Sequence, residues 1–327
     1  MALLAIALPL YNDEKSIEKT IQSVLAQTLQ DFELHIYDNC SSDQGLSLVT
    51  PYLKDKRIFL HTNSLNVGMA LNFNYCLQTA KHTNCKYVSI KSANDYIEPT
   101  YYEKCVQFLE ENPTYVLAYT QGTNTASGEQ AMYSYEQDDC WERIKSIVAT
   151  QGVGNMNYGV LRADIIDKIF PIMPIHGFDH IFFLNLAILG KLKKIDEVLY
   201  HREAPTKRTE EAYFKATCSS LTTSQTPLPH HMNLLFGYIT FCNEGFLNGL
   251  SKKDLIQCIV DTCCQARYAT LRSQYKQFKR QLRHASNTFD DFMLFPKFMA
   301  VRHFLVQNQK FRRRHPVDWL ADMFATR

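Results

Sequence analysis

A short apolar stretch near position 90 ends in three small polar residues. In KYVSIKSANDYIEP, residues 86–99, the strand-forming run YVSI is followed by Ser92, Asn94 and Asp95. Hard cations such as Mg²⁺ take oxygen ligands, and one or two carboxylates can suffice where phosphates and water complete the shell. One acid and two neutral oxygens could therefore hold a divalent cation here. The same residue types favour turns for purely local reasons, so a simple turn is the alternative.

Two other apolar runs also end in polar residues. Asp38 closes FELHIYD (32–38), and Asn63 and Asn66 follow RIFLHTN (57–63). In a parallel sheet with both faces covered, ligands bind at the carboxyl ends of the strands. We therefore expect these residues and the 92–95 segment to converge on one crevice.

The elements that would position these residues follow from hydrophobic periodicity. Continuous apolar runs predict strands at 3–10, 32–38, 57–63, 86–91, 115–120 and 193–203. Helical patterns cover 15–27, 69–80, 100–112 and 177–191, and Asn12 or Asp13 is expected to cap the first helix. Residues 151–169 are interpreted as a glycine-rich loop that runs into a helix. The alternation predicts an α/β fold, a Rossmann-like and mainly parallel sheet sandwiched by helices.

The chain changes character after Pro205. Residues 1–205 are predicted to form the sheet domain, 206–229 a linker-like segment, and 230–327 a mostly helical, basic region. Residues 266–327 contain 13 Lys and Arg but only 4 Asp and Glu, whereas the whole chain carries a net charge of +2. A basic amphipathic region is typical of binding to an anionic membrane surface. Packing of the same helices on the first domain is the alternative, and no nucleic-acid reader motif is present.

Targeting signals and cysteine spacing suggest the compartment. The first residues, MALLAIALPLY, lack the basic segment of a signal peptide. The apolar stretch at 181–190 is far shorter than the roughly 20 residues needed to cross a bilayer. The ten cysteines form no CxxC pair, which favours reduced, packed thiols over a zinc site or a disulfide framework. A cytoplasmic protein, soluble or peripheral, is expected.

Glycine-rich phosphate-binding loops are missing from the first strand end. The dinucleotide fingerprint GxGxxG does not follow residues 3–10, and no Walker lysine-serine motif occurs. Phosphates, if bound, must therefore be held by a metal ion or by basic side chains.

Residues 5–100 carry a dense resemblance to a known family. LPLYNDEKSIEKTIQSVLAQTLQDFELHIYDNCSSDQ resembles the start of a family 2 glycosyltransferase with the GT-A fold, and the similarity continues more thinly to about residue 205. Four motifs match in order. They are Pro-x-Tyr-Asn with a following Glu (Pro9, Tyr11, Asn12, Glu14), Ser-x-x-x-Gln-Thr (Ser23, Gln27, Thr28), Asp-Asn-x-Ser-x-Asp (Asp38, Asn39, Ser41, Ser42, Asp43) and Asn-x-Gly (Asn66, Gly68, with Asn72).

This resemblance implies a nucleotide-binding role for the strand-end residues. The implied contacts to the nucleotide are Pro9, Tyr11, Asn12, Glu14, Asp38, Asn66, Gly68, Asn72, Ser92 and Asn94. Asp38 is the implied contact to the base or ribose, and its alternative is a turn residue that caps the next helix.

The resemblance also implies a divalent cation, Mg²⁺ or Mn²⁺, on the donor diphosphate. The family usually places Asp-x-Asp or Asp-x-Asp-Asp at the position of Ser92–Asp95, and only Asp95 is a carboxylate here. We therefore expect Asp95 to contribute to a weak metal site that fills mainly when the donor binds.

The catalytic base is implied further along the chain. The family carries a Glu-Asp pair at the start of a helix, and GFDHIFFLNLAILG places Asp179 at the Asp position and Phe178 at the Glu position. Asp179 is the expected base, and an ordinary acid in the first turn of a helix is the alternative. Arg202 in YHRE is expected to reach the diphosphate, unless it is a surface residue. His176, His180 and His201 are interpreted as structural.

The resulting hypothesis is an inverting hexosyl- or hexosaminyltransferase. Its donor would be a nucleotide-diphosphate sugar, UDP-linked first of all, and its acceptor a glycan or lipid-linked hydroxyl at the inner face of a bacterial membrane. A non-catalytic nucleotide-sugar-binding protein is the main alternative. A nucleotidyltransferase of related topology is disfavoured because the first loop is neither glycine-rich nor basic.

Overall fold

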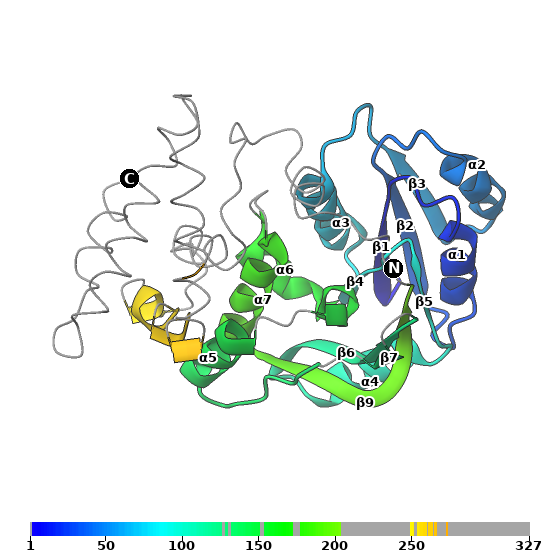
Figure 1. Cartoon of the computed structure of the whole chain (residues 1–327). Helices are drawn as coiled ribbons and strands as arrows, with labels where there is room; N and C mark the ends of the chain where they lie inside the picture. The colour runs from blue at the N-terminus through cyan, green and yellow to red at the C-terminus, as the bar shows by residue number, and fades with distance from the viewer. Residues whose placement is uncertain are drawn as a thin grey trace, which may run out of the picture.

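The structure is a computed structural model, and Figure 1 traces its chain. It describes residues 2–125, 128–129, 132–150, 154–172, 177–203, 249–251, 254–259, 261–263, 265–266 and 273, with the backbone alone at 129, 154 and 155. The strands are β1 (Leu4–Leu10), β2 (Phe32–Asp38), β3 (Ile58–Thr62), β4 (Tyr87–Ile90), β5 (Asp95–Ile97), β6 (Tyr115–Asn124), β7 (Gly128–Glu129), β8 (Val160–Arg162) and β9 (Lys191–Arg202). The helices are α1 (Ile17–Leu25), α2 (Gly45–Val49), η1 (Thr50–Lys54), α3 (Met69–Thr83), α4 (Tyr101–Glu111), α5 (Cys140–Thr150), η2 (Gly154–Tyr158), η3 (Ala163–Ile165), α6 (Ile166–Ile169) and α7 (Phe178–Leu189).

One sheet organises the described residues. Its strand order is β3-β2-β1-β4-β8-β6-β9-β5, and β7 pairs with β6 off this path. The pairs β1–β2, β2–β3, β1–β4 and β6–β9 are parallel, and they include the longest ladders. The shorter pairs β4–β8, β6–β8, β5–β9 and β6–β7 are antiparallel. The predicted α/β class with a mainly parallel sheet is confirmed.

The alternation of side chains in β1 separates two hydrophobic cores. Leu4, Ile6 and Leu8 face a core that contains side chains of α1 and α4. Ala5 and Ala7 face the other core, which contains side chains of α3, α5 and α7. Small residues on that face let α3 approach β1 closely. Helices therefore cover both faces of the sheet, and α1 and α3 lie on opposite sides of β1 in Figure 1.

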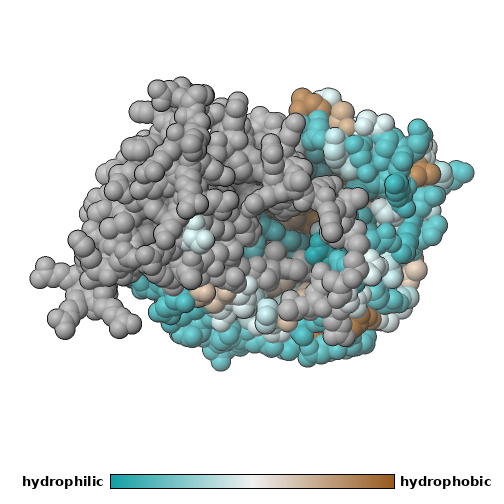
Figure 2. All heavy atoms as spheres, in the orientation of Figure 1, coloured by the Kyte–Doolittle hydropathy of each residue, from teal (hydrophilic) through white to brown (hydrophobic). Residues whose placement is uncertain are grey.

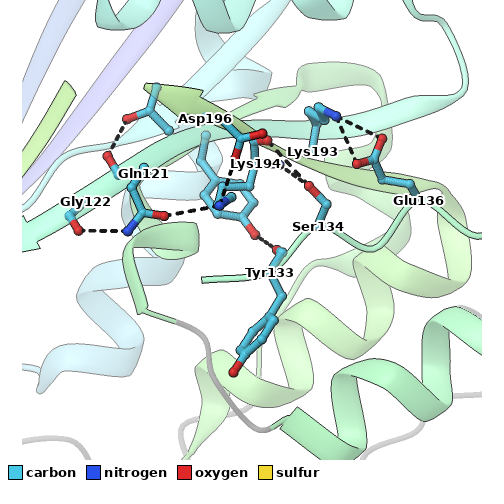
Figure 3. Close-up of polar contacts among 10 residues, drawn as sticks. Gln121, Gly122, Tyr133, Ser134, Glu136, Lys193, Lys194 and Asp196 are labelled. Atoms are coloured by element: carbon cyan, nitrogen blue, oxygen red, sulfur yellow. Dashed lines mark hydrogen bonds and ion pairs between the residues drawn. The ribbon is translucent and has the colours of Figure 1, made fainter. Parts of the chain in front are cut away.

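A segment after β7 fastens the first half of the curved strand β9. Ser134 Oγ accepts a hydrogen bond from Lys194 N at 2.9 Å, and Tyr135 pairs with Leu192 in an isolated bridge. Figure 3 shows the Lys193 ammonium directed at Glu136 and Lys194 directed at Gln121 of β6, at 2.9 and 3.3 Å. The first half of β9 is thus held on two sides, and its second half continues to β5.

Several sequence predictions need correction. The segment 151–169 contains a strand, β8, between β4 and β6, because Val160 and Leu161 pair with both neighbours. The N-cap of α1 is Ser16 rather than Asn12 or Asp13, because Asn12 adopts a positive φ of 55° and a turn from Asp13 precedes the helix. The short elements β5, α2 and η1 and the helix α5 were also missed.

The predicted domain boundary lies beside residues that the structure does not describe. The linker-like segment 206–229 and most of 230–327 lie outside the described residues, so the division at 205 stays a prediction. Within the described residues, no helix combines the length and apolar character needed to cross a bilayer. In the view of Figure 2, the described surface is mainly hydrophilic, and the large apolar side chains that are exposed come from separate elements, as Leu53, Phe59 and Val198 do.

Gly159 offers a test of how tightly β8 fits into the sheet. A Cβ atom there would lie 2.6 Å from Leu117 Cδ1 and 2.8 Å from the carbonyl oxygen of Ala118. We expect Gly159→Ala to lower the free energy of unfolding by about 1–3 kcal/mol, because the clash includes backbone. Denaturant unfolding would measure it. Gly45→Ala is the control, since its Cβ would lie no closer than 3.0 Å to its nearest neighbour, a side-chain oxygen of Asp43, and 3.7 Å from the nearest backbone atom. Equal losses for both variants would contradict the tight fit.

Candidate active site

The loops that follow β1 and β2 are locked together by hydrogen bonds. Asn12 N donates to Ser41 Oγ at 3.1 Å, and Asn12 Oδ1 accepts from Ser42 N at 2.8 Å. Glu14 Oε2 accepts from Gln44 N at 3.0 Å. The structure therefore brings the predicted residues Asn12 and Glu14 against the loop that begins at Asp38.

Asp38 closes β2 as predicted and is almost fully buried. Its two carboxylate oxygens accept from Ser41 N at 3.2 and 3.3 Å, which is the turn-forming role considered as its alternative. Pro9 is half-buried and pairs with Tyr37 in the β1–β2 ladder, whereas Tyr11 is 45% exposed just beyond the end of β1. Among the predicted nucleotide contacts, Tyr11 therefore presents an exposed aromatic ring at this edge of the sheet.

Asparagine side chains connect the next loop to this one. Asn63 Nδ2 donates to Asn39 Oδ1 and to Asn72 Oδ1, both at 3.1 Å, and Asn39 Nδ2 donates to Asn66 Oδ1 at 3.0 Å. Asn66 Oδ1 also accepts from Gly68 N, and Gly68 has the φ of 86° that glycine tolerates best. The predicted residues Asn66, Gly68 and Asn72 therefore build the loop itself.

The segment 92–95 is held from two sides. The Thr20 hydroxyl of α1 lies 2.9 Å from Ala93 O and 2.8 Å from Asp95 O, and Lys91 Nζ donates to Asp95 O and Ser92 O from beneath. The Ser92 hydroxyl contacts Asn94 Oδ1, and Asn94 is exposed. This segment presents neutral oxygens outward on a fixed backbone.

Asp95 itself faces inward. It is 3% exposed, its Oδ2 accepts from the Tyr200 hydroxyl at 2.8 Å, and its Oδ1 accepts from Glu203 N at 3.2 Å. Lys91 lies nearby and is fully buried. Burial lowers the pKa of Lys91 to about 7, against the opposing effect of the Asp95 charge. A buried carboxylate and a buried ammonium therefore lie under the predicted diphosphate segment.

The charges of three predicted residues act on Tyr158. Its pKa is raised to about 12, chiefly by burial and next by the charge of Asp95; the charge of Arg202 and a hydrogen bond with Ser92 oppose this rise, and the charge of Asp179 adds to it. Asp95 and Arg202 are direct partners in the β5–β9 ladder. Tyr158 also stacks on Tyr200, with ring centroids 5.4 Å apart. Tyr158 lies in the segment 151–169 and was not among the residues predicted for the site.

Asp179 lies in the first turn of α7, as predicted. Its side chain is half-buried, and its Oδ1 accepts from His180 N at 3.0 Å. Phe178, at the position of the family's Glu, is buried in the core and contacts Phe73 with ring centroids 5.3 Å apart. Asp179 therefore stands without an acidic neighbour in sequence.

Asn74 is a positioning residue that the sequence analysis missed. This buried α3 residue accepts from Ile172 N at 2.8 Å and donates to Ile172 O at 2.6 Å. Ile172 comes shortly before α7 in the chain. Asn74 therefore links α3 to the part of the chain that leads to Asp179. The sequence around Asn74 predicted only a helix. Its two hydrogen bonds are made to a residue 98 positions away, and no local sequence pattern indicates such a contact.

Gln27 and Thr28 of the second motif, and Arg162 of β8, make structural contacts. Gln27 Nε2 donates to Glu98 O at 2.8 Å, Thr28 N donates to Pro99 O, and Arg162 donates to backbone carbonyls near the end of α4. His201 contacts Thr123 and Glu98 and stacks on Tyr96. These contacts agree with the structural interpretation of His201, whereas His176 lies outside the described residues.

The residues at 92–95 fit a protein-held metal poorly. Both oxygens of Asp95 already accept hydrogen bonds inside the protein, and Ser92 and Asn94 add only neutral oxygens. In the part of the chain that the structure describes, no group of three or more His, Cys, Asp and Glu side chains could hold a metal ion. The assignment of Asp95 as a metal ligand stays a prediction.

Comparison with known proteins identifies the class. The fold is that of the GT-A glycosyltransferases: it resembles *Staphylococcus aureus* TarS 1-349 in complex with UDP-GlcNAc with a TM-score of 0.61 at 16% identity, over 93% of this chain and 80% of that one. Residues 5–161 match the sequence model of Glycosyl transferase family 2, and the predicted resemblance to that family is confirmed over this part of the chain.

Two curated relatives match parts of the chain. *Bacillus subtilis* (strain 168) putative glycosyltransferase EpsE is 30% identical over 113 residues, which are 34% of this chain and 40% of EpsE. *Pasteurella multocida* (strain Pm70) chondroitin synthase is 25% identical over 202 residues, 61% of this chain and 20% of that protein. The chain thus spans less than half the length of either relative.

The Asn74 clamp can be tested by stability. Asn74→Ala leaves the buried N–H and C=O of Ile172 without their side-chain partner, and each orphaned group costs about 1–3 kcal/mol. We expect a loss of about 2–3 kcal/mol in denaturant unfolding. Gln107→Ala, which removes an exposed contact to Glu111, is the control and should stay within about 0.5 kcal/mol of the parent. An Asn74→Ala variant as stable as the control would refute the clamp.

Proposed function

We propose that the chain transfers a hexosyl or hexosaminyl group from a nucleotide-diphosphate sugar to an acceptor hydroxyl, with inversion at the anomeric carbon. The proposal is supported by the charges of Asp95, Asp179 and Arg202, which all act on the buried Tyr158, and by the ladder that pairs Asp95 with Arg202. A carboxylate and a guanidinium on either side of a ligand site are what inverting transfer needs.

The proposed donor site runs along the ends of β1 to β4. In this proposal Tyr11 offers its exposed ring to the base, and Asp38 contacts the base or the ribose. Pro9, Asn12, Glu14, Asn66, Gly68 and Asn72 shape the nucleotide pocket through the interlocked loops, and Ser92 and Asn94 line the diphosphate. A UDP-sugar is the favoured donor, because TarS was solved with UDP-GlcNAc on a similar fold.

Asp179 is the proposed base. It accepts the proton of the acceptor hydroxyl as that oxygen attacks the anomeric carbon, and the bond from the anomeric carbon to the diphosphate oxygen breaks on the opposite side. Arg202 neutralises the leaving diphosphate. A divalent cation, Mg²⁺ or Mn²⁺, would enter mainly on the diphosphate oxygens and would supply further charge neutralisation there.

The proposed acceptor is a glycan or lipid-linked hydroxyl at the inner face of a membrane. A glycan or lipid-linked acceptor follows from the resemblance to enzymes of surface-polysaccharide assembly, and chondroitin synthase is among the relatives by name. Contact with the inner face of a membrane would be made by the basic region after residue 266, which lies almost wholly outside the described residues.

A second candidate is a nucleotide-sugar-binding protein without catalysis. The core position of Phe178 favours it, because the acid that the family places there is gone and a buried phenyl ring cannot assist a base. Binding of a sugar nucleotide with no transfer or hydrolysis would identify this candidate.

The test is a nucleotide-release assay with UDP-, GDP- and dTDP-sugars. We expect release from one nucleotide class, and a fall of about 10²–10⁴-fold in acceptor-dependent transfer for Asp179→Asn, because that is the range that general bases contribute. Asp164→Asn, an exposed acid at the start of η3, is the matched control and should retain activity.

Ligand binding provides the complementary readout. Asp179→Asn should still bind the donor in calorimetry, because the base touches the acceptor rather than the nucleotide. A bound nucleotide at a hundredfold excess over Kd should stabilise the protein by about 2.7 kcal/mol in thermal unfolding. If no sugar nucleotide is released, bound or stabilising, the transferase proposal is wrong.

A further inference from the structure

Lys91 is a fully buried lysine directly before the proposed diphosphate segment. Its ammonium lies 2.8 Å from Asp95 O, 3.1 Å from Ser92 O and 3.5 Å from the Tyr200 hydroxyl. An ammonium has three N–H donors and no acceptor, and three acceptors surround it here. The geometry therefore suits the charged form of Lys91, which is the main form below pH 7 because burial lowers the pKa of this ammonium to about 7.

Asp95 supplies the opposite charge. The Tyr200 hydroxyl lies between the two groups, because it donates to Asp95 Oδ2 at 2.8 Å and accepts from Lys91. Among the described residues, Asp95 is the carboxylate whose charge acts on Lys91. Tyr158 and Tyr101, which pack against Tyr200, are neutral hydroxyl groups. Lys91, Tyr200 and Asp95 thus form one buried, charge-balanced unit.

This unit changes the electrostatics of the segment above it. A site with several unpaired acids repels a diphosphate, and a divalent cation must then bridge the two sets of negative oxygens. In this segment Ser92 and Asn94 are neutral, and the single acid is compensated by Lys91. Arg202, the ladder partner of Asp95, and Asp179 carry opposite charges that both act on Tyr158. Within residues 92–95, the single acid is therefore matched by the charge of Lys91.

We propose that Lys91 is the internal counter-charge of Asp95, and that this pairing lets the donor diphosphate bind at residues 92–95 without a divalent cation. Asp95 is then a positioning residue that fixes the segment through Tyr200 and Glu203. The inference rests on the proposed function, since it concerns the binding of that donor. A cation carried by the diphosphate remains compatible with it, but the protein's affinity for the donor does not depend on one.

The unmodified protein provides the direct test. The sugar nucleotide that gives the largest thermal shift among UDP-GlcNAc, GDP-mannose and dTDP-glucose is titrated by calorimetry in EDTA and in saturating Mn²⁺ or Mg²⁺. We expect the two Kd values to agree within about threefold, where tenfold corresponds to 1.4 kcal/mol. Binding that weakens more than about tenfold in EDTA and returns with the cation would overturn the inference.

Charge-removing variants test the pairing itself. Lys91→Met leaves the Asp95 charge uncompensated, so we expect a lower melting temperature and, in EDTA, donor binding weaker by about tenfold or more. Asp95→Asn should also lower the melting temperature. The double variant Lys91→Met/Asp95→Asn carries neither charge and should recover most of the stability and cation-independent binding.

The matched control is Lys86→Met. Lys86 precedes the other end of β4, is exposed and contacts Glu110, so its loss should change neither the melting temperature nor the effect of EDTA appreciably. If the loss of melting temperature in the double variant is as large as the sum of the losses in the two single variants, the pairing is overturned. If Lys91→Met does not fold, recovery of folding in the double variant supports the pairing, and failure of both to fold refutes it.

Failure of this inference is distinguishable from failure of the proposed function. Donor binding that appears only with a cation overturns the inference and leaves the transferase proposal standing. Absence of binding to every sugar nucleotide, with or without a cation, overturns both.

Discussion

The site depends on the alignment of the carboxyl ends of four parallel strands. The ladders place Leu10 of β1 opposite Asp38 of β2, and Asp38 opposite Thr62 of β3, so each following loop begins at the same edge. β4 pairs with β1 from Leu4 to Ala7 and ends three residues earlier on that edge. Because side chains alternate between two buried cores, a shift of one residue would bury the wrong face, and the register is therefore firmly set.

Hydrogen bonds join the loops that follow the aligned strands and hold them rigidly at one edge of the sheet. Loops without regular structure leave backbone N–H and C=O groups that must find partners when water is excluded. Here the partners are short polar side chains, such as Asn12, Asn39 and Glu14, which bond the backbone of a neighbouring loop. Residues that a motif assigns to the nucleotide can thus serve the fold first. A ligand that meets these preformed loops loses less ordering entropy on binding.

The strand ends were predictable because an apolar run and the polar residues that follow it are local features of the sequence. β2 was predicted at 32–38 and ends at Asp38 as expected, whereas Asp95, predicted to close the strand at 86–91, is the first residue of β5. The strand β8 was not predicted, since three residues carry too little pattern and its pairing partners, at positions 87–89 and 117–118, are distant in sequence. The inward orientation of Asp95 and the clamp by Asn74 depend equally on contacts about 100 residues away. The sequence pattern therefore predicted where the strands end, and tertiary contacts decided which groups each side chain contacts there.

The relation between Asp95 and Lys91 shows why residue type alone misleads at a charged site. An acid at the end of a strand suggests a metal ligand only while its charge is unpaired. Burying an ammonium beside it is costly by itself, and the cost is offset only if the two charges and their hydrogen bonds are satisfied together. Both conditions hold here, because Tyr200 and backbone groups satisfy the two ions. The charge that would attract a cation is thereby already balanced inside the protein.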